Sequence, residues 1–201
     1  MCILGTSRVK GERGRGMPTD EQILSLYRAR DEQGPVYLQQ KYGRYCLHIA
    51  QNILGNWADA QECVNDAYLA LWEVLAQRPP ACLQAFVGGV VRNLSCKRYR
   101  HLRAQKRNAQ FDLVLEELAE CVGQAQVEQA WEAAEAARAI DAFLHGEKPA
   151  ARCVFVRRYW YADSIEGIAR ALGMSQSKVK STLYRMRKRL RTHLQREGFQ
   201  I

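Results

Sequence analysis

The sequence predicts an all-α protein of two small helical domains, joined by a flexible acidic linker, with a helix-turn-helix in the C-terminal domain. Three observations support this fold class. Apolar residues recur at the helical period along nearly all of the 201 residues, alternating β-branched runs typical of strands are absent, and charge is arranged in blocks. We expect a basic, disordered tail over residues 1–16, helical domains over 17–104 and 134–196, and the acidic linker over 105–133.

The formal net charge of +9 hides a strong alternation along the chain. Counted as Lys and Arg less Asp and Glu, the charge is +3 over residues 1–16, −4 over 17–76, +8 over 77–110, −8 over 111–147 and +10 over 148–201. Two basic segments separated by an acidic one predict two distinct nucleic-acid contacts rather than one diffuse affinity for polyanions.

Several classes of protein are disfavoured by the composition. No apolar run approaches the roughly 18 residues of a membrane span, and the basic start lacks the apolar centre of a secretory signal, so we expect a soluble cytoplasmic protein. Residues 1–16 are interpreted either as a disordered tail or as an upstream start, in which case the natural beginning is Met17. The seven cysteines never form Cys-x-x-Cys and never stand beside histidine at zinc-ligand spacing. They are interpreted as reduced structural thiols, and no metal or cofactor is expected.

A helix is predicted from about Ala58 to Ala76, with one apolar and one acidic side. The apolar side carries Val64, Ala67, Leu71 and Leu75, flanked by Trp72. The other side carries Asp59, Glu62, Asp66 and Glu73. Such a stripe is often only a solvated face. However, a helix face that only contacts solvent usually carries both Lys and Glu, because Lys–Glu pairs stabilise the helix. This stripe carries negative charge alone, which indicates a partner-binding surface.

A second helix is predicted from about Leu83 to Arg103, after a non-helical connection at Arg78, Pro79 and Pro80. Gly88 and Gly89 weaken it by about 1 kcal/mol each relative to alanine. Its basic and aromatic side chains suit stacked bases and phosphates better than a simple phosphate clamp. These side chains are Arg92, Lys97, Arg98, Tyr99, Arg100 and Arg103.

The C-terminal domain contains the most specific motif, a helix-turn-helix. Ser164 is predicted to cap a short helix and Ser175 a longer one, with Gly173 in the turn between them. Ala169, Gly173 and Val179 have the required spacing: the small alanine permits close helix approach, the glycine permits the turn and the valine fills the core.

The longer helix presents a basic and polar face suited to the major groove. Residues near its N-terminus are expected to face base edges, and residues 187–191 are expected to favour phosphates. The predicted DNA-contacting residues are Gln176, Ser177, Lys178, Lys180, Ser181, Tyr184, Arg185, Arg187 and Lys188.

Three runs in this order resemble a known family. They are DAQECVNDAYLALW at 59–72, FVGGVVRNLSCKRYR at 86–100, and VFVRRYW at 154–160 followed by VKSTLYR at 179–185. Together they resemble the two-domain bacterial sigma factors of RNA polymerase, the extracytoplasmic-function type.

The resemblance implies a function for each surface and no catalytic activity. Core RNA polymerase would bind Asp59, Glu62, Asp66, Trp72 and Glu73. The −35 element would be read as duplex by the helix-turn-helix. An anti-sigma factor is implied as a further partner, and no small-molecule substrate or membrane insertion is implied. The melted −10 element would be read by Arg78, Arg92, Asn93, Lys97, Arg98, Tyr99, Arg100 and Arg103.

Three alternatives remain open. A stand-alone helix-turn-helix regulator would need a receiver or ligand-binding domain, and residues 17–104 lack the strand-helix alternation of a receiver. A DNA-processing enzyme such as a recombinase would use a serine nucleophile, yet no phosphate-binding glycine loop, metal-ligand cluster or carboxylate constellation supports one. A helical adaptor would bind polymerase without reading promoters.

Overall fold

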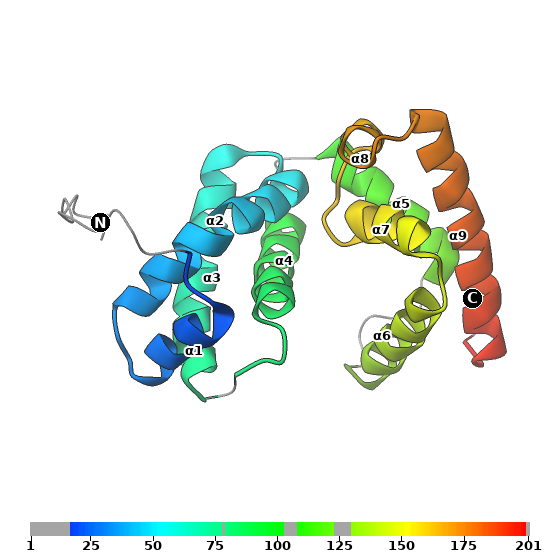
Figure 1. Ribbon diagram of the computed structural model, residues 1–201. Coiled ribbons are helices and arrows are strands. Elements are labelled where there is room, and N and C mark those ends of the chain that lie inside the picture. Colours follow the sequence, from blue (N-terminus) through cyan, green and yellow to red (C-terminus); the bar gives the residue numbers. More distant parts are fainter. Residues whose placement is uncertain (1–16, 78, 103–107, 123–129, 200–201) are drawn as a thin grey trace.

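The computed structural model describes residues 17–77, 79–102, 108–122 and 130–199, with the backbone alone for 120–122 and 130–136. Every regular element in this described part is a helix, which confirms the predicted all-α class (Figure 1). The helices are α1 (Asp20–Arg28), α2 (Gln33–Leu54), α3 (Trp57–Gln77), α4 (Leu83–Leu102), α5 (Ala109–Val122), α6 (Ala130–His145), α7 (Pro149–Tyr159), α8 (Ile165–Leu172) and α9 (Gln176–Arg196).

The first four helices pack together into one group, on the left of Figure 1. A capping box starts α1, because the Thr19 hydroxyl accepts from the backbone N–H of Gln22 while the Gln22 side chain accepts from that of Thr19. The predicted apolar side of α3 faces the core: Val64, Ala67, Leu71 and Leu75 are buried. The two helices predicted over about 58–76 and 83–103 correspond to α3 and α4.

Gly88 lies on the side of α4 that packs against Tyr45 of α2. A Cβ atom at this position would overlap the Tyr45 hydroxyl and would lie 2.9 Å from Cζ and 3.0 Å from Cε1 of the same ring. At Gly89 the nearest atom would be Cζ2 of Trp160, at an ordinary 3.9 Å. The two adjacent glycines therefore differ in role, because only Gly88 is required by the packing of α4 on α2.

The helix-turn-helix has the local structure that the sequence predicts. The Ser164 hydroxyl accepts from Gly167 N–H at the start of α8, and the Ser175 hydroxyl accepts from Lys178 N–H at the start of α9. Gly173 adopts the left-handed conformation (φ 62°) between them. Val179 and Ala169 are both buried at the contact of α8 with α9, as expected.

Helix α5 occupies part of the segment expected to be a flexible linker. Phe111 and Val114 are buried, and Phe111 packs edge-on against Tyr99 of α4 with ring centroids 5.0 Å apart. Asn108, just before α5, donates to the carbonyls of Asn52 (2.8 Å) and Ile53 (3.0 Å) at the end of α2. Because α5 also contacts α7 and α9, residues 109–122 form a packed helix between the two helical groups and differ from the expected linker. Residues 103–107 and 123–129 lie outside the described part.

No helix in the described ranges combines the length and apolarity of a membrane span. The same part of the chain contains no cluster of three or more His, Cys, Asp or Glu side chains that could hold a metal ion. The cysteines whose side chains are described there, Cys46, Cys63, Cys82, Cys96 and Cys153, are free thiols, of which Cys46 and Cys63 are buried.

Candidate nucleic-acid interface

Helix α9 presents its predicted DNA-contacting face to solvent. Its apolar side is seated in the core by Val179, Leu183, Met186 and Leu190, all with at most 1% of their surface exposed. With the Ser175 cap, this burial fixes the rotation of the helix about its axis. The exposed members of the predicted face are Gln176, Ser177, Lys178, Lys180, Ser181, Tyr184, Arg185 and Lys188.

Arg187 is the one predicted member of this face that turns inward. It follows Leu183 by one helical turn, so it lies at the edge of the buried stripe. Its Nη1 donates to the Tyr159 hydroxyl at 3.0 Å and lies 3.5 Å from the Glu117 carboxylate. Arg187 therefore joins α9 to α7 and α5, and its contacts are with the protein interior.

Glu117 is the centre of this ionic cluster, which the sequence did not reveal. Arg158, itself 3% exposed, donates to both Glu117 oxygens at 3.0 and 2.9 Å, and Tyr159 donates at 3.0 Å. Burial opposes ionisation of Glu117, but the bonds from Arg158 and Tyr159 and the charges of Arg158 and Arg187 outweigh it, so the pKa of Glu117 lies below its ordinary value. The signal that could have indicated this role was the helical register that Glu117 shares with buried Phe111 and Val114 on α5.

Helix α4 exposes part of the predicted −10 surface. Asn93, Lys97 and Arg100 are exposed. Tyr99 is 2% exposed and packs on Phe111, so its ring lies in the core rather than on the surface. Arg78 and Arg103 of the predicted set lie outside the described residues.

Arg92 contacts the α7–α8 loop and is only partly exposed. Its Nη1 donates to the carbonyl oxygen of Trp160 at 2.7 Å, and its guanidinium lies over the Trp160 ring, 5.5 Å from the centroid. Desolvation by burial lowers the pKa of Arg92 below its ordinary value. A cation expected to meet DNA is thus held against the C-terminal helices.

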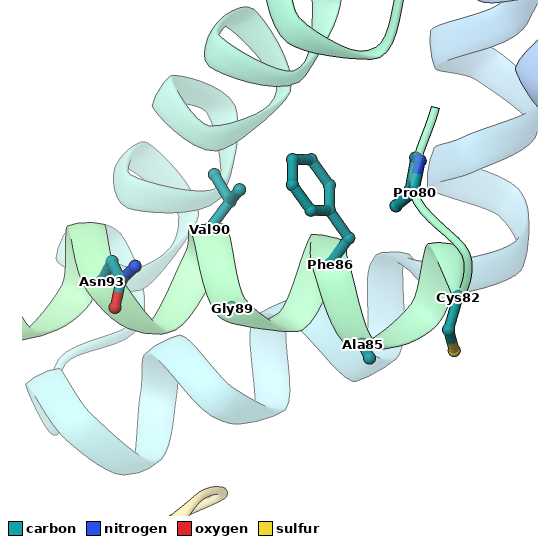
Figure 2. A pocket seen from close by; sticks show the side chains of 7 residues that line it. All are labelled: Pro80, Cys82, Ala85, Phe86, Gly89, Val90 and Asn93. Carbon is teal, nitrogen blue, oxygen red and sulfur yellow. The ribbon is translucent and has the colours of Figure 1, made fainter. Parts of the chain in front are cut away.

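An open apolar pocket of about 420 Å³ lies beside the basic residues, between α4 and the loop before it. Figure 2 shows the Phe86 and Val90 side chains on one side of α4, facing Pro80 of the loop. Asn93 lies at the other end of the pocket, one helical turn beyond Gly89. Phe86 and Val90 are only partly buried, since they line this pocket.

The predicted acidic stripe on α3 is exposed except at Asp59, and it pairs with a cation of α4. Glu62 and Asp66 are 64% and 57% exposed in their side chains, and Asp59 is 14% exposed. Arg98 of α4 forms a short ion pair with Glu62 and lies 3.6 Å from Asp59 and 3.9 Å from Asp66. The stripe therefore has a counter-charge, because the neighbouring helix supplies a cation that periodicity within α3 could not reveal.

The far end of α3 carries the other predicted polymerase-binding residues. Trp72 is partly buried, 5.7 Å from the Tyr27 ring, and the Arg30 guanidinium lies over it at 5.4 Å. Arg30 also lies 3.6 Å from Glu73, which is 67% exposed. Between Asp66 and Glu73, Leu69 is 71% exposed, an apolar side chain on the acidic face that the sequence did not single out.

Comparisons with known proteins bear on the C-terminal helices. Residues 148–190 match the family described as sigma-70, region 4, a range that covers α7, α8 and most of α9. No curated protein matches the chain significantly. A solved structure titled "Structure of CnrH in complex with the cytosolic domain of CnrY" is 19% identical, with the alignment covering 88% of this chain and 97% of that one at a TM-score of 0.42.

The family match falls on the helix-turn-helix whose capped helices and exposed basic face are described above. Over residues 148–190, this match confirms the predicted resemblance to sigma factors. Residues 148–190 thus match a sigma-70 region 4 domain, a DNA-binding domain of transcription initiation.

Proposed function

We propose that this protein is a two-domain sigma factor of the extracytoplasmic-function type, which binds core RNA polymerase and directs promoter-specific initiation. The observation that carries the proposal is the region 4 match on a helix-turn-helix with an exposed basic face. The basic face of α4 and the acidic face of α3 supply the two further surfaces that this function needs. As the resemblance implies, the protein acts in the cytoplasm and is held inactive by an anti-sigma factor.

The −35 element is the proposed target of α9. Gln176, Ser177 and Lys180 lie in its first two turns, where a recognition helix meets base edges. Lys188 lies toward its C-terminal half, where phosphate contacts position the helix. Since Arg187 is engaged with Tyr159, its proposed role is to hold the orientation of α9 rather than to contact a phosphate.

The −10 element is the proposed target of α4 and its pocket. Lys97 and Arg100 are exposed for phosphates, and the pocket between Phe86 and Pro80 offers an apolar wall to one unstacked base, with Asn93 to hydrogen-bond its edge. Extruding a base costs unstacking energy, which capture in such a pocket offsets.

The acidic face of α3 is the proposed polymerase-binding surface. Glu62, Asp66 and Glu73 offer negative charge around the exposed Leu69, an arrangement that suits a basic helical partner with one apolar anchor. The Arg98 pairs leave this surface available, because exposed ion pairs contribute only about 0–1 kcal/mol and a partner cation can replace Arg98.

Arg185→Ala is expected to lower transcription from promoters that depend on the −35 element by about tenfold, since one such contact is worth about 1–3 kcal/mol. Run-off transcription with core polymerase on a pool of promoter fragments measures this. Arg196→Ala, which removes an exposed charge from the last turn of the same helix, is the matched control. Equal loss with both variants would refute a specific contact of Arg185 with the −35 element.

Asp66→Lys is expected to weaken binding to core polymerase about tenfold without changing which promoters are chosen, because it reverses a charge in the middle of the acidic face. Titration of labelled protein with core polymerase gives the affinity, and run-off at saturating protein gives the promoter set. Asp141→Lys on α6, also exposed, controls for the change of charge. A changed promoter set with Asp66→Lys would contradict this division of roles.

Binding and transcription assays of the unaltered protein distinguish the competing functions. Stoichiometric capture of core polymerase with initiation from a narrow promoter set supports the sigma factor. Specific duplex binding without polymerase capture would instead indicate a stand-alone regulator, and capture without promoter selection would indicate an adaptor. Cleavage or joining of the bound DNA would indicate a recombinase-like enzyme.

A further inference from the structure

Arg98 of α4 points toward the acidic face of α3. Its side chain is only 24% exposed, whereas its neighbours Lys97 and Arg100 are exposed. The guanidinium forms a short ion pair with Glu62, which lies 36 residues earlier in the chain. The sequence predicts Arg98 as a contact of the −10 element, but the packing of α4 on α3 directs this side chain to the carboxylates.

Three carboxylates surround this guanidinium. One terminal nitrogen, Nη2, lies 3.6 Å from Asp59 and closer still to Glu62, and Nη1 lies 3.9 Å from Asp66. The three acidic residues follow one another at steps of three and four, so α3 aligns them on one face. One positive charge faces three negative charges, which leaves two negative charges in excess. Asp59, Glu62 and Asp66 thus form an acidic site that one planar cation occupies without neutralising it.

Arg98 fits the acidic site only in part. Its Nε is buried and has no hydrogen-bond partner within the described part of the chain, and a buried donor without an acceptor is unfavourable. Glu62 and Asp66 keep 64% and 57% of their side-chain surface exposed, so water screens their attraction to Arg98. Arg98 is therefore held weakly enough for another cation to replace it.

The position of the acidic site identifies the cation that would replace Arg98. Leu69, which is 71% exposed, follows Asp66 by about one helical turn on the proposed polymerase-binding surface. A basic helix that packs on Leu69 would bring an arginine or lysine to the same carboxylates. The charge of Arg98 would repel this second cation, because both would lie within one small site.

We propose that Arg98 is an intramolecular competitor for polymerase: in the free protein it occupies the acidic site that an arginine or lysine of polymerase takes in the complex. Polymerase binding exchanges one cation for another, so the loss of the Arg98 pairs offsets part of the attraction. Arg98 thereby lowers the affinity for polymerase. The inference rests on the proposed function, since the site for which Arg98 competes belongs to the proposed polymerase-binding surface.

Arg98→Met is the variant that tests the competition, because it removes the charge and keeps an unbranched apolar side chain against α3. Core polymerase is titrated into labelled full-length protein at low salt, and the dissociation constant is expected to fall at least about threefold. A variant that merely disturbed the surface would bind polymerase more weakly, so the direction of the change distinguishes competition from a structural role. Arg98→Lys keeps the competing charge and is expected to stay within about twofold of the unaltered protein.

Arg100→Met is the matched control, because it removes one positive charge from an exposed position of the same helix. It is expected to change the dissociation constant by less than about 1.5-fold, since its charge lies in solvent. The gain from Arg98→Met should shrink in a Glu62→Gln background, where the neutral amide attracts neither cation. The gain should also narrow as the salt concentration rises. If Arg98→Met loses helix content by circular dichroism, Arg98→Gln carries the test.

An unchanged or weaker affinity in folded Arg98→Met, or in Arg98→Gln if that variant carries the test, overturns the competition. An equal gain with Arg100→Met overturns it as well, because net charge alone would then explain the change. Both outcomes are read against an unaltered protein that binds polymerase. Failure of the inference is therefore distinct from failure of the proposed function, which is seen when the unaltered protein captures no polymerase.

Discussion

Replacing Glu117 by glutamine is expected to lower the free energy of unfolding by about 2–3 kcal/mol, because it leaves the buried Arg158 guanidinium without its counter-charge. Arg158 is 3% exposed and donates twice to Glu117, while Tyr159 and Arg187 converge on the same carboxylate. Urea denaturation followed by circular dichroism measures the change. The expected loss of stability is smaller than the full cost of breaking a buried ion pair, because the Glu117 side chain is 27% exposed.

Glu116→Gln is the matched control for this substitution. Glu116 is adjacent on α5 and exposed, so its replacement makes the same chemical change without a buried partner and is expected to alter stability by at most about 0.5 kcal/mol. Equal effects of the two substitutions would show that the Glu117 cluster contributes no more than a surface charge.

The stabilisation from Glu117 also has a defined pH dependence. Since the pKa of Glu117 is lowered in the folded protein, its contribution is fully present above the ordinary glutamate pKa and is lost as the pH falls through the folded-state pKa. The stability difference between the unaltered protein and Glu117→Gln should therefore be constant near neutral pH and should narrow as the pH falls below about 4.5. A difference that persists unchanged in acid would exclude the charge as its cause.

Alanine at Gly88 and at Gly89 is expected to change stability in opposite directions. Both substitutions gain about 1 kcal/mol of helix propensity. Gly88→Ala also forces a methyl group into the Tyr45 ring, which is itself packed against Tyr161, and overpacking of this kind costs about 1–3 kcal/mol. We expect a net loss of up to about 2 kcal/mol for Gly88→Ala and a gain of about 0.5–1 kcal/mol for Gly89→Ala.

Each glycine variant is the control for the other, because they are adjacent in the same helix. Thermal and urea unfolding of both variants checks the signs. Stabilisation by both would mean that Tyr45 moves aside at little cost, and that the close approach of α4 to α2 does not depend on Gly88.

The sequence by itself determined the elements and most of the helix-turn-helix. Helical periodicity located α3, α4, α8 and α9, and the serine caps and Gly173 marked the ends of α8 and α9, because these are interactions within a few residues of the chain. The buried side of α9 followed from the same periodicity, and with it the exposure of eight of nine predicted DNA-contacting residues.

Only the tertiary structure decided what faces each charged side chain. Arg98 pairs with the acidic stripe of α3, Arg92 is covered by Trp160, and Arg187 turns toward Glu117. Periodicity reports on which side of its own helix a residue lies, but it carries no information about which helix packs against that side. The partners of these arginines are 36, 68 and 70 residues away in the chain, so their pairing depends on how the helices pack in space.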